Sequence, residues 1–184
     1  NTWLGDHLLP PLLEYGDHKK IHIVPDWNKL GPWVKNNRDK ENKRLYRELI
    51  KWHEESPIDL FFYYGGGIQL ASETLNKIND LGIATLSLGT DDLSTLKLGE
   101  IEGVGRGLSG IAGLFDLNFT TSSQTCDEYL LYGGTPYFLP LAANHKLYNR
   151  MSIERDIPIA QFGARHPHRE ALVSQLLKRG IKVQ

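Results

Sequence analysis

The stretch Ile83-Ala-Thr-Leu-Ser-Leu-Gly-Thr-Asp-Asp92 decides the fold class predicted for this chain. Its first six residues are rich in apolar and β-branched types. A run of this length is too short for an ordinary helix, but it fits a strand buried on both faces of a parallel sheet. The run breaks at Gly89, and Thr90, Asp91 and Asp92 follow where the chain must turn. Because ligands in open α/β sheets bind beyond the carboxyl ends of the strands, these side chains are the first candidates for chemistry.

Outward from that strand, predicted strands alternate with predicted helices. Residues 26–39 and 93–106 are expected to be loops, and a helix that starts or kinks at Pro10-Pro11 is expected within residues 1–16. This alternation predicts an α/β fold with a Rossmann-like, doubly wound parallel sheet. The predicted strands cover residues 20–24, 60–64, 83–88, 115–121, 137–139, 157–162 and 181–183, and the predicted helices cover residues 40–55, 69–81, 108–114, 124–132 and 168–179.

Composition narrows the class of protein. A formal net charge of −1 and a pI near 6.7 give no reason to expect nucleic acid as a partner. No run approaches the roughly 20 apolar residues that span a bilayer, so no membrane span is expected. Cys126 is the only cysteine, which fits a reducing compartment. The chain begins at Asn1 without a basic or apolar leader, so no signal peptide is expected and a cytoplasmic location is predicted.

Two domains are predicted, covering residues 1–150 and 151–184. The first helix has no strand before it, although βα units normally begin with one, and residues 157–184 form a βαβ pattern cut off in its second strand. The polar residues 148–156 between them are typical of a linker. We therefore expect one domain without its opening strand, joined to the first βα unit of a second Rossmann-like domain, as a piece of a longer protein.

The carboxylates of Asp91 and Asp92 allow two interpretations. One of them can cap the next segment while the other is solvated. Alternatively, one acts as a general base or orients an acceptor hydroxyl, and the neighbouring charge raises its pKa. The pair is not spaced as Asp-x-Asp, and no cluster of His, Cys, Asp and Glu suggests a metal, so no metal site is predicted.

Three glycine-containing segments are further candidates. Gly65, Gly66 and Gly67 follow a predicted strand, where they form either a tight turn or a place for backbone amides to approach a ligand. Residues 105–110 match G-x-G-x-x-G but follow a loop rather than a strand, which favours a mobile loop over a dinucleotide site. The third segment is either a solvated polar loop or a phosphate site at a helix N-terminus, and its candidate residues are Gly163, Arg165, His166 and Arg169.

Several of these segments together resemble one family, the CgeB-type, spore-maturation-like glycosyltransferases. The resemblance covers roughly residues 58–184, and it depends on the order and spacing of motifs that are each weak alone. The matching segments are residues 82–92 (Gly-Ile-Ala-Thr-Leu-Ser-Leu-Gly-Thr-Asp-Asp), residues 115–121 with Tyr129 and Gly133, residues 139–144 (Leu-Pro-Leu-Ala-Ala-Asn), and residues 159–163 (Ile-Ala-Gln-Phe-Gly) with Arg169.

The resemblance implies a GT-B fold, in which two Rossmann-like domains face each other across a cleft. The first domain mainly binds a hydroxyl-bearing acceptor, and the second binds most of a nucleotide-sugar donor; no cofactor or metal is usually required. It implies that Asp91 and Asp92 face the cleft, that Gly65–Gly67 and Thr90 line the acceptor side, and that residues 163–169 approach the donor diphosphate. Most of the donor domain is missing from these residues, so the isolated chain is expected to have little or no transferase activity.

Two other classes of function remain open. A non-catalytic module could keep the Rossmann-like scaffold and bind a sugar, a nucleotide or a protein partner, because fold does not fix function. A nucleotide-binding enzyme of another kind, such as an oxidoreductase, is the third reading. The donor, the acceptor, the stereochemical outcome and the oligomeric state are not predicted.

Overall fold

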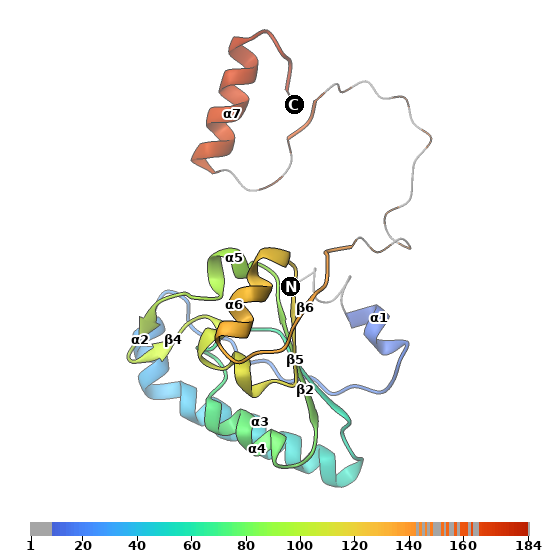
Figure 1. Cartoon of the computed structure of the whole chain (residues 1–184), viewed down its shortest axis with the longest axis vertical. Helices are drawn as coiled ribbons and strands as arrows, with labels where there is room; N and C mark the ends of the chain where they lie inside the picture. Colours follow the sequence, from blue (N-terminus) through green and yellow to red (C-terminus); the bar gives the residue numbers. More distant parts are fainter. Residues whose placement is uncertain are drawn as a thin grey trace. The chain divides into compact units, whose positions relative to one another are not determined.

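The computed structural model describes residues 9–142, 144, 146, 148, 152, 154, 157, 159–161, 163 and 166–183 (Figure 1). It divides the chain into two compact units, Asn1–Ala142 and Ala143–Gln184, against a predicted boundary after residue 150. Each unit is described by itself.

The first unit is built on a four-stranded sheet in which every neighbouring pair of strands is parallel. The strands lie in chain order across the sheet, and the register aligns Ser87 in the second strand with Tyr63 in the first and Asn118 in the third. The predicted α/β class with a Rossmann-like parallel sheet is therefore confirmed. The four strands are β1 (Leu60–Tyr63), β2 (Ala84–Gly89), β5 (Leu117–Thr120) and β6 (Pro136–Phe138).

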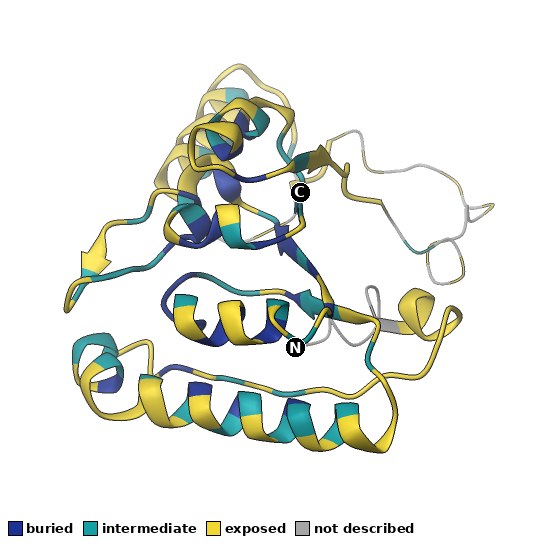
Figure 2. Ribbon diagram, turned by 60° about the horizontal axis from the view of Figure 1, so that its bottom comes forward, coloured by how far each residue is buried: buried dark blue, intermediate teal, exposed yellow. Residues whose placement is uncertain are grey.

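Helices and short turns connect these strands, and α3 and α4 lie side by side (Figures 1 and 2). Among the described residues, no helix combines the length and apolar character that crossing a bilayer requires. The helical elements are α1 (Leu9–Leu13), α2 (Leu30–Trp33), the π-helical turn η2 (Val34–Arg38), α3 (Asp39–Glu55), α4 (Ser72–Asn79), α5 (Asp92–Thr95), the 3-10 turns η3 (Leu108–Gly110), η4 (Ala112–Leu114) and η5 (Ser123–Thr125), and α6 (Cys126–Leu131); β3 (Glu100–Ile101) and β4 (Val104–Gly105) form a separate antiparallel hairpin.

Four predictions for the first unit are wrong. Residues 93–106 are not only a loop, because they contain most of α5 and the β3–β4 hairpin, and residues 108–114 form the two 3-10 turns η3 and η4 instead of one helix. Residues 20–24 are not a strand: Ile21 and Ile23 pack against the core from a segment without regular secondary structure, and Arg44 Nη2 donates to the His22 carbonyl over 2.7 Å. Their alternation reflects one-sided burial rather than pairing in a sheet. Residues 26–39 are not only a loop, because α2 and η2 lead directly into α3. The polar composition of residues 26–39 does not indicate a helix, although Trp33 of α2 is buried in the interior.

The central strand β2 is largely buried (Figure 2), and its two faces carry different kinds of side chain. On one face, Tyr63, Ser87 and Asn118 are buried, and Asn118 Nδ2 donates to Ser87 Oγ over 2.8 Å. Side chains of α3, α4 and α6 belong to the core cluster that includes Tyr63. Apolar side chains point from the opposite face, where Leu88 is buried and Phe62, Leu86, Leu117 and Phe119 are partly buried.

The second unit contains α7 (Pro167–Lys178), which confirms the predicted helix. No strand forms at Ile157, at 159–161 or at 181–183, so the strands predicted on either side of α7 are not formed in these described residues. Pro158 and Phe162 of the first predicted strand lie outside the described residues. A parallel strand is stabilised only by a neighbour, and the described part of this unit supplies none.

Candidate functional site

The triglycine turn and the aspartate doublet leave the sheet at the same edge. β1 and β2 are parallel neighbours, so their carboxyl ends lie together, and Gly65–Gly67 follows one end while Thr90–Asp92 follows the other. The hydroxyl oxygens of Tyr64 and Thr90 are 3.4 Å apart, which links the two turns directly. The structure therefore brings together the residues that the sequence predicted for the acceptor side and for catalysis.

Asp91 presents its carboxylate to solvent. It occupies the N-cap position of α5, but its side chain makes no capping hydrogen bond. Its backbone carbonyl accepts the first hydrogen bonds of the helix from the amides of Ser94 (2.9 Å) and Thr95 (3.0 Å), and it also accepts from the hydroxyls of the same two residues over 3.1 and 2.9 Å. Of the two predicted readings, capping by this carboxylate is not observed, and the group is open to a ligand.

Asp92 has the opposite environment, because the residue is only 3% exposed. The Tyr129 hydroxyl donates to Asp92 Oδ2 over 3.0 Å, and the carboxylate packs on Gly89, where an added Cβ would collide with it. Burial raises the pKa of Asp92, and the charge of Asp91 raises it further, while hydrogen bonds from Thr120 and Tyr129 act in the opposite direction. Asp92 is thus a buried anchor that ties the start of α5 to α6.

Backbone amides of the triglycine turn form hydrogen bonds within the chain. The Gly66 amide donates to Gln69 Oε1 over 2.9 Å, and the Gly67 amide donates to the Gly107 carbonyl over 3.0 Å. A Cβ on Gly66 or Gly67 would collide with the backbone carbonyls of Arg106 or Gly107. Two glycine-rich segments that are far apart in the sequence therefore need glycine in order to approach each other.

Arg38 and Asn42 donate hydrogen bonds to the residues that directly follow this turn, and neither was predicted from the sequence. Arg38 donates to the carbonyls of Ile68 (2.9 Å) and Leu70 (3.0 Å), and Asn42 Nδ2 donates to the Gln69 carbonyl over 2.8 Å. Arg38 lies in residues 26–39, which were predicted to be a loop, whereas Asn42 lies in the first turn of the helix predicted over residues 40–55. Extending the helix towards its N-terminus would have placed them on one face, since they are four residues apart.

In the second unit, three of the four predicted donor-phosphate residues are described, and Arg165 lies outside the described residues. Gly163 adopts a φ of 124°, and an added Cβ there would lie 2.6 Å from Arg169 Nη1. His166 occupies the N-cap position of α7, and its ring stacks on that of His168 with centroids 5.7 Å apart. The structure therefore gathers Gly163, His166 and Arg169 around the start of one helix.

No group of three or more His, Cys, Asp or Glu side chains that could hold a metal ion occurs in the part of the chain that the structure describes. Cys126, on α6, is a free thiol.

Comparison with known proteins finds no family model, no curated protein and no solved structure that matches this chain. The function is therefore inferred from the site itself.

Proposed function

We propose that this chain supplies the acceptor side of a GT-B glycosyltransferase, which transfers a sugar from a nucleotide-sugar donor to a hydroxyl group. The observation that carries the proposal is the exposed carboxylate of Asp91 at the carboxyl edge of a parallel sheet, next to the paired hydroxyls of Thr90 and Tyr64. An attacking hydroxyl needs a group that accepts its proton or orients it, and an exposed carboxylate can do either. Hydroxyl groups at the same edge can hydrogen-bond a sugar.

The two aspartates then have different roles. Asp91 acts as the general base or the orienting group, because its carboxylate is exposed and does not cap α5. Asp92 positions Asp91, because the hydrogen bond from the Tyr129 hydroxyl fixes Asp92, and Asp92 directly follows Asp91 in the chain. On the donor side, the N-terminus of α7 together with Arg169 and His166 suits a diphosphate. The proposal involves no metal or cofactor, and it includes a cytoplasmic location, which the free Cys126 supports.

The test measures the transfer of labelled sugar from UDP-, GDP- and dTDP-sugars by the full-length protein that contains this chain. Replacing Asp91 by Asn should lower turnover by about 10²- to 10⁴-fold, the range typical of a lost general base. Asp80→Asn is the matched control, because Asp80 follows α4 at the opposite, amino end of β2 and should leave turnover unchanged. Equal turnover in wild type and Asp91→Asn would remove Asp91 from the mechanism.

A non-catalytic binding module is the second candidate. It is favoured by the internal use of the edge groups: the amides of Gly66 and Gly67 and the carboxylate of Asp92 all bond within the chain. Saccharide titrations followed by NMR separate the two functions. Binding at the Thr90–Asp91 amides with no transfer from any donor would support the module and contradict the enzyme.

A further inference from the structure

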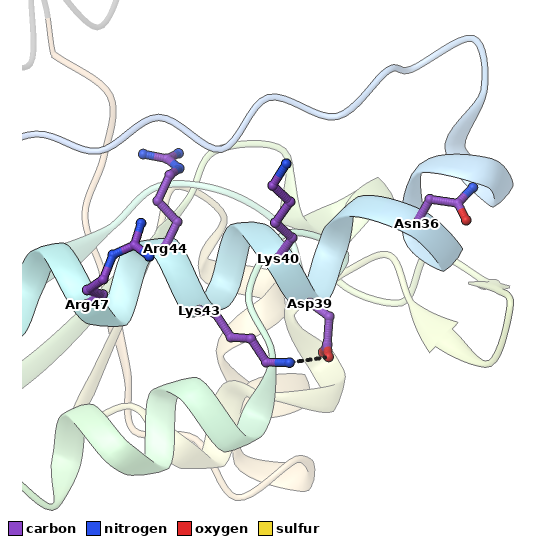
Figure 3. A pocket seen from close by; sticks show the side chains of 6 residues that line it. All are labelled: Asn36, Asp39, Lys40, Lys43, Arg44 and Arg47. Carbon is purple, nitrogen blue, oxygen red and sulfur yellow. Dashed lines mark ion pairs between the residues drawn. The ribbon is translucent and has the colours of Figure 1, made fainter.

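The outward face of α3 carries a hollow that the proposed function does not use. The opposite side of the helix faces the core through Asn42, Leu45 and Leu49. One lining residue, Asn36, belongs to the π-helical turn η2, and π-helical turns often occur at functional sites. The hollow has a volume of about 520 Å³ and is lined by Asn36, Asp39, Lys40, Lys43, Arg44 and Arg47 (Figure 3).

Two of the four cations in this hollow already have acidic partners. Lys43 Nζ lies 3.4 Å from Asp39 Oδ2, and Arg44 bonds Glu41 at 2.7 Å and Glu48 at 3.1 Å. Within the described residues, neither Lys40 nor Arg47 forms an ion pair or a hydrogen bond. In the part of the chain that the structure describes, Lys40 and Arg47 are therefore the two cations of the hollow without an acidic partner, while Arg44 is shared by two carboxylates, so the four cations and the three carboxylates Asp39, Glu41 and Glu48 sum to a charge of +1.

The spacing of these two cations indicates the ligand. Lys40 and Arg47 are seven residues apart on one helix, which is about 10 Å along its axis. Guanidinium and ammonium groups are the usual protein ligands of phosphate oxygens, and Arg can engage two oxygens at once. Their long side chains can converge from both ends on an elongated dianion, whereas a single phosphate group would satisfy only one of them well. We propose that this hollow binds an anion with two linked phosphate groups, either as free pyrophosphate or as the diphosphate of a nucleotide.

Isothermal titration of the chain with inorganic pyrophosphate and with orthophosphate tests this site. Pyrophosphate should bind at least about tenfold more tightly than orthophosphate, and affinity should fall with added salt, because the contacts are charged and exposed. The double variant Lys40→Gln/Arg47→Gln should lose at least about tenfold in pyrophosphate affinity. Titration with ADP distinguishes the sources: equal affinity identifies the diphosphate alone, and tighter binding that the double variant also loses identifies a nucleotide.

Lys51→Gln is the matched control. Lys51 lies on the same exposed helix but outside the hollow, so this variant should change pyrophosphate affinity by less than about twofold. Gln is a good helix former, and equal thermal midpoints for all variants show that α3 is intact. Orthophosphate binding as tight as pyrophosphate binding, an equal loss in Lys51→Gln, no loss in the double variant, or no binding by the wild type would each overturn the proposal.

Discussion

Two adjacent aspartates at the end of β2 have opposite environments, and their difference is decided by a residue far away in the sequence. The sequence predicted where the doublet lies, because a buried strand that stops at Gly89 must turn there. It could not predict which carboxylate is buried. That choice depends on Tyr129, whose hydroxyl comes from an element 37 positions further along the chain. A cap and a catalytic group are both expected after a strand, and only the fold separates them.

The buried carboxylate of Asp92 predicts a specific pH dependence of stability. Its folded-state pKa is raised, mainly by burial, above the ordinary value of 3.8. The folded state therefore holds the proton of Asp92 more tightly than the unfolded state does. The resulting contribution of Asp92 to the free energy of unfolding is full below pH 3.8, and it is lost as pH rises through the raised pKa. Urea unfolding of wild type and Asp92→Asn across this window should show the wild type losing stability relative to the variant. Parallel curves would contradict the assignment.

Tyr129→Phe checks the same assignment from the other partner. The variant removes the donor to Asp92 Oδ2 while keeping the ring, so the ionised carboxylate loses a hydrogen bond that lowers its pKa. Leaving a buried acceptor unsatisfied costs about 1–3 kcal/mol. The loss of stability should therefore be larger at neutral pH, where Asp92 is more ionised, than at acid pH. An equal loss at both pH values would show that this bond does not depend on the charge of Asp92.

At the scale of elements, the sequence predicted the regular segments and missed how the irregular ones pack. β1, β2, β5 and α3 were predicted because their apolar patterns are long and regular. The contact between residues 65–67 and 105–107 leaves no periodic pattern, because glycines have no side chain to bury. Residues 20–24 show the reverse error: their alternation is real, but none of the described strands pairs with them.

The contact between these two glycine turns predicts a selective effect of one methyl group. Gly67→Ala would place Cβ against the carbonyls of Gly105 and Gly107, which belong to the backbone and cannot rotate away. Overpacking of this kind typically costs about 1–3 kcal/mol in the free energy of unfolding. Gly99→Ala is the control, since nothing lies within 4 Å of an added Cβ there and its backbone φ is not positive. Denaturant titration of both variants measures the difference, and equal stabilities would show that the turns separate at little cost.

At the scale of the molecule, the sequence predicted a parallel sheet but not that one of its buried faces is polar. Continuous apolar runs fit strands buried on both sides, and the residues of β2 satisfy that pattern. In the structure, one side buries polar residues such as Ser87 and Asn118, which bond to each other, while the opposite side carries Leu88, which is buried, and Leu86 and Phe119, which are partly buried. The pattern therefore indicates that a strand is central, and it cannot show what covers each face.

The division into two units predicts that the first unit is stable without the second. Every member of the buried core cluster lies within Asn1–Ala142, from Leu45 in α3 to Tyr129 in α6. A protein that ends at Ala142 should therefore unfold cooperatively, with a thermal midpoint within about 4 °C of the full chain, the shift that ~1 kcal/mol produces in a domain of this size. A second truncation, after Leu114, removes β5 and α6 with Tyr129 and should abolish cooperative unfolding. Circular dichroism melts compare the three proteins. If ending the chain at Ala142 were as damaging as ending it at Leu114, residues 143–184 would have to supply part of the core.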